Sequence, residues 1–268
     1  MTEKLSWSDA IEALADGLQN SDTIHIGDFY EFVRDIWSLS YDNPEAFRAW
    51  HVQIICEDIE QVISGEMEYP YYCAILPRFH FKSTILGHAF SVYRLLTQAK
   101  GRDSSVLYLS YSDGMSQYHI QEMNKAIRRN PILNKWMINR TPKADYSFRY
   151  MTQNQQPIEV KHGGLFSFKR GMHVNGALIA DDLLKDPDNP LNLGVINKIE
   201  DHFMTESLFI PNMGVPVIVL GTPMVPGDLL DKLQDDERFL FRKLPALDPA
   251  PGRRVLMPEL YDEKWLLN

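Results

Sequence analysis

The sequence predicts an α/β fold in which a mainly parallel sheet is flanked by helices, with a helical segment before it. Two observations support this prediction. From residue 71 onward, short apolar runs of strand length alternate with longer segments of helical period, which is typical of a parallel sheet with helices on both faces. The 268 residues are 44% hydrophobic, which is enough to bury a core as one large domain, or as a domain and a subdomain.

Residues 1–66 are expected to form a helical segment packed on the sheet domain. Apolar residues recur there at helical spacing, and no strand pattern precedes Tyr71. The spaced residues are Ile11, Leu14 and Leu18, then Phe29, Phe32, Val33 and Ile36, then Trp50, Ile54, Ile55 and Ile59.

Five strand-like runs and three helical patterns make up the expected core domain, residues 67–250. The runs are 71–76, 105–110, 164–168, 177–180 and 215–220, and the helical patterns are 85–96, 113–129 and 193–209. The Asn-Pro pair at 130–131 ends the second helix, because the residue before a proline is biased away from helical backbone. Several prolines after residue 244 break regular structure, so residues 251–268 are expected to begin a linker.

Charge and cysteine content exclude several classes of protein. The formal net charge is -9 and the pI is near 5.4, so the surface as a whole is not the basic field that coats nucleic acid, and any DNA contact must be local. Cys56 and Cys73 lie in apolar stretches outside any Cys/His cluster, and we expect small buried thiols. No run is typical of a signal peptide or a membrane span, so we expect a soluble protein in a reducing cytoplasm.

Residues 76–84, LPRFHFKST, lie between an apolar strand and an amphipathic helix, where a phosphate-binding loop belongs. Backbone N–H groups at a helix start cradle phosphates, a lysine reaches the β and γ oxygens, and a hydroxyl holds Mg²⁺. Lys82 and Ser83 fit the last two roles. The residues expected to contact nucleotide from this loop are Pro77, Arg78, Phe79, His80, Phe81, Lys82, Ser83 and Thr84.

The loop departs twice from the pattern G-x-x-x-x-G-K-[ST], because Leu76 and Phe81 stand where glycines are expected. Glycine serves there because the loop needs unusual dihedrals and a close approach to phosphate. Phe81 therefore predicts either a changed loop path or backbone strain. A chance Lys-Ser pair at a helix start is the alternative.

Asp181 and Asp182 follow the apolar run 177–180, about 100 residues after Lys82. In such a pair, the first carboxylate typically holds Mg²⁺ through water and the second orients the attacking water, so we assign Asp181 to the metal and Asp182 to the water. We expect Lys82 and Asp181 to converge at adjacent strand tips around one magnesium-bound triphosphate. An aspartate pair that caps a turn is the alternative.

Three further side chains are candidates for the chemistry. Thr222 follows the run 215–220 and is suited to sensing the γ-phosphate. Arg170 lies beside a glycine and could stabilise the transferred phosphoryl group on a neighbouring subunit, whereas Arg78 could reach the same phosphates in cis. The alternatives are a Gly-Thr-Pro turn at Thr222, a solvated Arg170 and a structural ion pair at Arg78.

In their order and spacing, these motifs resemble the N-terminal ATPase domain of tailed-bacteriophage terminase large subunits. That family often has P-R-x-x-x-K-S-T, then R-G before an apolar strand ending in D-[DE], then an apolar strand ending in G-T. The matching segments are 77–84, then 170–171 with 181–182, then 215–222, and the resemblance covers most of residues 45–245. Phe79 and Phe81 depart from the family pattern, as does Asp182 in place of the commoner glutamate.

The resemblance implies a P-loop NTPase fold of the ASCE/RecA-like class and an ATP-hydrolysing motor that translocates double-stranded viral DNA independently of sequence, with ATP and Mg²⁺ as cofactors. It implies a ring, expected to be pentameric, docked on a portal protein, with Arg170 acting in trans as an arginine finger. A terminase small subunit would select the DNA. The motor would work in the host cytoplasm, transiently at the procapsid portal. The family's C-terminal nuclease has no room after about residue 250, so no DNA cleavage is expected from this chain.

The resemblance also suggests where adenine and DNA would bind. Trp50, His51 and Gln53 precede the loop where such ATPases often hold adenine by ring stacking and an amide contact, although Trp50 could instead be a core residue. One dense basic stretch could grip DNA phosphates without reading sequence, or could be a solvated helix end. That stretch contains Lys125, Arg128, Arg129, Lys135 and Arg140.

Two other functions remain open on the sequence. A superfamily 2 helicase-like translocase uses a similar motor core but requires a second RecA-like domain, for which the sequence has no pattern. A nucleotide-binding assembly module without turnover is favoured by the two missing glycines.

Overall fold

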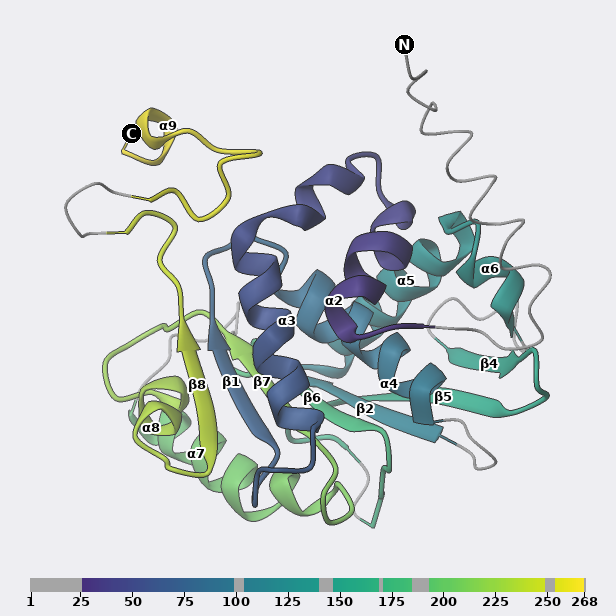
Figure 1. The fold of residues 1–268 in the computed structure, drawn as a ribbon. Coiled ribbons are helices and arrows are strands. Elements are labelled where there is room, and N and C mark those ends of the chain that lie inside the picture. The colour runs from purple at the N-terminus through teal and green to yellow at the C-terminus, as the bar shows by residue number, and fades with distance from the viewer. Residues whose placement is uncertain are drawn as a thin grey trace.

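An eight-stranded sheet runs through the computed structural model, which describes residues 26–98, 104–139, 147–168, 171–184, 193–248 and 254–267. The strand order is β3-β4-β5-β2-β6-β7-β1-β8 (Figure 1). The strands are β1 (Tyr71–Ile75), β2 (Ser104–Ser110), β3 (Met137–Asn139), β4 (Phe148–Thr152), β5 (Pro157–Gly164), β6 (Ala177–Asp181), β7 (Val217–Gly221) and β8 (Phe239–Lys243). Neighbours from β5 to β8 pair in parallel, whereas β3, β4 and β5 pair antiparallel at one edge.

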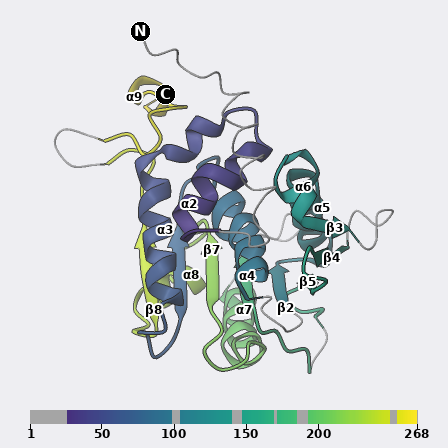
Figure 2. The same cartoon turned by 45° about the vertical axis from the view of Figure 1, so that its right-hand side comes forward.

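Helices cover both faces of the sheet. On one face lie α2, α3, α4 and α5, and on the other lie α7 and α8 (Figures 1 and 2). The α-helices are α2 (Phe29–Glu31), α3 (Trp50–Ile63), α4 (Phe90–Gln98), α5 (Asp113–Arg129), α6 (Leu133–Trp136), α7 (Leu193–Thr205), α8 (Leu229–Gln234) and α9 (Glu263–Leu266). Shorter π-helical and 3-10 segments are η1 (Phe32–Ile36), η2 (Trp37–Ser40), η3 (Pro44–Arg48), η4 (Ser83–Ala89) and η5 (Ser207–Phe209).

The predicted fold class is confirmed by the way the strands bury both of their faces. Along β2, Leu107 packs into the core beneath α7 and α8, while Tyr108 packs into the core beneath α3, α4 and α5. Because helices cover both faces, the inner strands contain continuous apolar runs, and these runs allowed the strands to be predicted from the sequence. Cys56 and Cys73 are buried free thiols, as predicted. None of the described helices is both long enough and apolar enough to cross a membrane.

The segment before the sheet shares a core with it. Phe29 of α2, Phe47 of η3 and Val52 of α3 are buried in one cluster with Tyr72 of β1, and Met257 joins that cluster from the other end of the chain. Helical elements run from Phe29 to Ile63 in the described part of this segment, and its boundary at residue 66 stays a prediction. Three residues of the predicted pattern, Ile11, Leu14 and Leu18, lie outside the described residues.

Part of the sheet differs from the sequence prediction. The run 164–168 is not a strand, because β5 ends at Gly164 and the backbone N–H groups of Ser167 and Phe168 turn back to donate to Gly164 O. A Cβ atom at Gly164 would lie 2.7 Å from Asp113 N, so β5 ends where it abuts the start of α5. The antiparallel strands β3 and β4 and the edge strand β8 were not predicted.

Candidate nucleotide-binding site

The candidate residues meet at the carboxyl edge of the parallel strands. The loop that carries Lys82 follows β1, Asp181 ends β6, and Thr222 follows β7. Parallel strands bring their carboxyl ends to one edge of the sheet, where ligands bind in open α/β folds. The fold is P-loop NTPase-like. The expectation that Lys82 and Asp181 lie at adjacent strand tips is wrong by one strand, because β7 lies between β1 and β6.

Lys82 connects the three segments directly. Its Nζ donates to Asp182 Oδ1 at 2.9 Å and to Thr222 Oγ1 at 3.4 Å. The Lys82 side chain is only 7% exposed, whereas that of Asp182 is 37% exposed. The ammonium group is thus held inside the edge of the sheet, with its carboxylate partner on the solvent side.

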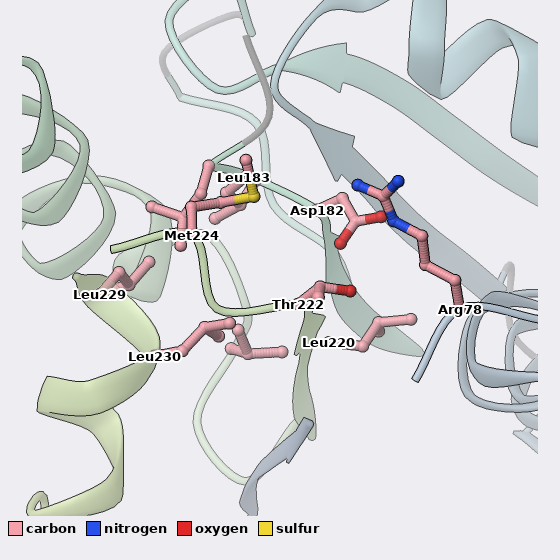
Figure 3. A pocket seen from close by; sticks show the side chains of 11 residues that line it. Arg78, Asp182, Leu183, Leu220, Thr222, Met224, Leu229 and Leu230 are labelled. Carbon is pink, nitrogen blue, oxygen red and sulfur yellow. The ribbon is translucent and has the colours of Figure 1, made fainter. Parts of the chain in front are cut away.

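A pocket adjoins this ion pair. Arg78, Asp182 and Thr222 line its polar side, and leucines that include Leu230 of α8 line its apolar side (Figure 3). In Figure 3 the Arg78 guanidinium lies on the same side of the pocket as the Asp182 carboxylate. Within the described part of the chain, no side-chain hydrogen bond or ion pair engages Arg78. Its guanidinium is therefore available to an anionic ligand in this pocket.

The phosphate-loop backbone is in the left-handed region at two phenylalanines. The φ angles are 65° at Phe79 and 60° at Phe81, so the strain expected at Phe81 is present, with a second instance two residues earlier. The ring of Phe81 stacks on Phe47 with centroids 4.6 Å apart and planes 7° apart. This packing holds the loop in a path that glycine would adopt without steric cost.

His80, between these two phenylalanines, faces the protein rather than the sheet edge. Its Nδ1 donates to Arg78 O at 2.8 Å, and its ring contacts Tyr261 with centroids 4.9 Å apart. Burial lowers the pKa of His80, so the ring is neutral at pH 7. Ser83 and Thr84 are half-buried at the start of η4, directly after Lys82.

Asp181 lies in a buried polar cluster that the sequence did not predict. Its side chain is fully buried, and its Oδ2 accepts a hydrogen bond of 2.6 Å from the Tyr108 hydroxyl. His119 Nε2 of α5 lies 3.6 Å from the same oxygen, and His119 Nδ1 lies 2.9 Å from Nε2 of His88 in η4. Burial lowers the pKa of His88 well below its ordinary value and also lowers the pKa of His119, so both rings are neutral at pH 7.

No sequence motif pointed to this cluster, although strand register explains it. Tyr108 pairs with Ile179, and Ser110 pairs with Asp181 across the β2–β6 ladder. Residues two apart in a strand share a face, so Tyr108 and Asp181 lie on the same face of neighbouring strands. Finding this contact requires knowing that β2 and β6 are neighbours, which depends on the strand order.

The residues near Asp181 are suited to a magnesium ion that is shared with phosphates. No cluster of three or more His, Cys, Asp or Glu side chains that could hold a metal occurs within the described ranges. Asp181 Oδ1, however, is buried without a hydrogen-bond partner among the described residues. Mg²⁺ usually takes one or two protein carboxylates and completes its shell with waters and substrate phosphates. A single free carboxylate oxygen beside a phosphate loop fits this mode of binding.

A larger cavity shares the lining residue Thr222 with the pocket of Figure 3. It measures about 710 Å³ and is lined by Trp50, Pro77 and Arg254, among others. The Trp50 indole donates to Val255 O at 3.2 Å, and the Arg254 guanidinium lies 3.7 Å from the ring centroid. Gln53 is not among the lining residues, because its amide donates to Glu57 on the exposed side of α3. His51 is fully buried, and burial lowers its pKa to about 4.

The remaining candidates are placed only in part. Arg170 and Arg140 lie outside the described residues. Arg128 and Arg129 lie in the last turn of α5, as the sequence predicted, and Lys125 pairs with Glu122 one turn earlier. Cations at the end of a helix are favoured by the helix dipole, which gives Arg128 and Arg129 a structural explanation.

Comparisons with known proteins give a structural likeness but no family assignment. No protein-family model matches the sequence, and no curated protein matches it. The chain is similar to the crystal structure of the HK97 bacteriophage large terminase, with a TM-score of 0.49 and 14% sequence identity over 74% of this chain. It spans only 40% of the length of that structure. The fold assignment rests on the strand order and register described above.

Proposed function

We propose that this chain is an ATPase domain of a viral DNA-packaging motor of the terminase large-subunit type. The observation that carries the proposal is the contact of Lys82 with both Asp182 and Thr222 at the carboxyl edge of the sheet. Three segments that are far apart in sequence, each with the residue type that phosphoryl transfer needs, meet at one ammonium group. The packaging role is inferred from the motif resemblance.

The chain's residues divide the work of hydrolysis as follows. Lys82 and the loop N–H groups would bind the β- and γ-phosphates, and Ser83 and Asp181 would hold Mg²⁺, which would supply positive charge to the phosphates. Because Lys82 now donates to Asp182, its engagement with phosphate releases that carboxylate to orient the attacking water. Thr222 loses its contact with Lys82 in the same exchange and reports the γ-phosphate to β7.

The cavity beside Trp50 is the proposed adenine site. It adjoins Pro77 at the start of the loop, and its Trp50–Arg254 stack offers a planar surface to a base. An additional contact from Gln53 requires its amide to leave Glu57. Arg78, exposed at the pocket in Figure 3, would add a charge to the phosphates in cis.

The assembly around the motor follows from the resemblance alone. It consists of a homo-oligomeric ring, pentameric in this proposal, on a portal protein, with a small subunit and double-stranded DNA as further partners. Arg170 would complete each site from the neighbouring subunit, and Lys125, Arg128 and Arg129 would contact DNA phosphates. The place of action would be the host cytoplasm and, transiently, the procapsid portal.

Steady-state ATP hydrolysis tests the proposal. We expect Lys82→Ala and Asp182→Ala each to reduce turnover by about a hundredfold or more, because each removes a group that acts in phosphoryl transfer. Lys232→Ala, which removes an exposed lysine paired with Glu200, is the matched control and should leave turnover unchanged. If ATP binds but the wild type turns over no faster than the two site variants at assembling concentrations, the chain is a binding module without turnover.

A further inference from the structure

The hydrogen bond between Tyr108 and Asp181 fixes one end of a carboxylate and leaves the other end free. Tyr108 and Asp181 are both fully buried, and the 2.6 Å bond occupies Asp181 Oδ2. A neutral tyrosine can only donate to a carboxylate, so the bond fixes the rotation of the Asp181 side chain. Oδ1, which is not used by this bond, has no partner among the described residues.

Two histidines extend the contact to the helix that follows the phosphate loop. The His119 ring stacks on Tyr108 with centroids 4.9 Å apart and planes 28° apart, and it pairs with His88 of η4. The other ring nitrogen of His119, Nε2, lies 3.6 Å from Asp181 Oδ2. Side chains from η4, α5 and β2 therefore form one chain of contacts that ends at Asp181.

Gly87 of η4 makes room for this arrangement. A Cβ atom at this position would lie 2.5 Å from the Tyr108 hydroxyl oxygen, closer than any stable contact allows. Glycine inside a helix costs up to about 1 kcal/mol relative to alanine, so its presence here has a packing explanation. The helix that begins at Ser83 is shaped to accept the Tyr108 hydroxyl.

A second buried tyrosine–aspartate hydrogen bond, which joins β1 to α3, serves as a structural comparison. Tyr72 of β1 donates to Asp58 Oδ2 at 2.9 Å, and Arg242 donates to both oxygens of Asp58 at 2.7 and 2.6 Å. The charge of Asp58 is thus balanced by a guanidinium. Asp181 has no Lys or Arg ion-pair partner within the described residues. A buried carboxylate without a cation is costly, which points to a cation that arrives with the ligand.

We propose that Tyr108 is a positioning residue for Asp181, and that it directs Oδ1 toward a divalent cation bound with the nucleotide. Through His119 and His88, it keeps the carboxylate at a fixed place relative to η4, the helix that begins at Ser83 directly after Lys82. The inference rests on the proposed function, because it assumes that Asp181 serves a metal–nucleotide complex.

Binding of Mn²⁺ in the presence of ADP, followed by electron paramagnetic resonance, tests the role of Tyr108 without measuring turnover. Tyr108→Phe keeps the ring and removes the hydroxyl, so we expect Mn²⁺ affinity to fall by about tenfold or more, as for other residues that orient metal ligands. ADP affinity in EDTA should not change. Tyr72→Phe removes the comparable hydroxyl at Asp58 and should leave Mn²⁺ affinity as in the wild type.

Gly87→Ala gives an independent test, because the added methyl group displaces the same hydroxyl. We expect it to weaken Mn²⁺ binding about as much as Tyr108→Phe does, and we expect the double variant to be no weaker than either single variant. Removing the hydroxyl also relieves the closest contact, so the double variant should melt at a higher temperature than Gly87→Ala alone.

The outcomes separate this inference from the proposed function. If the wild type binds Mn²⁺ with ADP and Tyr108→Phe binds it equally well, the positioning role is wrong and the nucleotide site stands. An equal loss in Tyr72→Phe also overturns the positioning role, because the effect would then reflect general stability. If the wild type binds ADP no better with Mn²⁺ than in EDTA, both proposals fail.

Discussion

At the scale of single residues, the phosphate loop adopts left-handed backbone at two phenylalanines with different surroundings. Phe79 is 79% exposed, so its ring contributes little to burial. Phe81 is partly buried and stacks on Phe47, which offsets part of the steric cost of its φ angle. Left-handed backbone costs an ordinary residue roughly 1–2 kcal/mol relative to glycine, so the two positions should respond differently to the same substitution.

Replacing each phenylalanine with glycine tests this difference. We expect Phe79→Gly to raise the free energy of unfolding by about 0.5–1 kcal/mol, because relief of strain exceeds the added entropy of the unfolded chain. Phe81→Gly should lower the free energy of unfolding by about 1–3 kcal/mol, because the buried ring is lost. Urea denaturation measures both values. A loss of stability in Phe79→Gly would show that the exposed ring makes a contact of its own.

Residue identity alone predicted some of the site and not the rest. A bulky residue in place of glycine predicts strain wherever the loop keeps its path, so Phe81 could be identified from the pattern. The side chains that hold Asp181 could not, because Tyr108 is one of several apolar residues in its strand and His119 lies in a helix with no motif. Their contact depends on which strands are neighbours, and this is a property of the whole sheet.

At the scale of elements, two glycines near the junction between β5 and α5 have different surroundings. Gly164 ends β5 against the backbone at the start of α5, with Asp113 N 2.7 Å and Ser112 C 3.0 Å from any added Cβ atom. Gly114, in the first turn of α5, has open space around it and is exposed. The first is required by packing, whereas the second only weakens its helix.

Alanine substitutions at these two glycines should move stability in opposite directions. Gly164→Ala must separate β5 from the start of α5, so we expect the free energy of unfolding to fall by about 1–3 kcal/mol, the range for an overpacked core site. Gly114→Ala should raise it by about 0.5 kcal/mol, because alanine favours helix. Thermal and urea denaturation of the two variants provide the test. Equal effects would show that the junction can relax around a methyl group.

The elements that the sequence predicted are those buried on both faces. The inner strands β1, β2, β6 and β7 are uninterrupted apolar runs, since helices cover both sides of them. The edge strands are partly exposed, and β8 in particular has only one buried residue, so its FLFRK segment carries little pattern. In β5, buried Ile158 and Val160 alternate with charged residues. The run after Gly164 is more apolar, so the strand was predicted there, at 164–168, instead of at Pro157–Gly164.

At the scale of the whole molecule, a helix that precedes the sheet and a segment that follows it both contact the phosphate loop. His51 of α3 lies 6.2 Å from His80 of the loop, measured between ring centroids, and His80 contacts Tyr261 near the other end. The Tyr261 hydroxyl donates to Phe79 O at 3.2 Å. The burial of His51 is therefore produced by three distant segments together and is lost when the molecule unfolds.

That burial makes the stability of the molecule depend on pH. The pKa of His51 is about 4 in the folded protein and about 6.5 in an unfolded chain, so the unfolded state binds more protons between these values. Stability that is fully present above pH 6.5 is therefore lost as the pH falls, and His51 alone should account for about 2 kcal/mol between pH 7.5 and pH 5.

Urea denaturation at pH 7.5 and pH 5 measures this contribution when the wild type is compared with His51→Gln. Glutamine does not titrate, so the variant should lose about 2 kcal/mol less than the wild type over this interval, whatever its stability at pH 7.5. Other titrating groups contribute equally to both proteins, so only the difference between the two changes matters. Equal losses in the two proteins would mean that water reaches the His51 ring, and that the three segments do not close around it in solution.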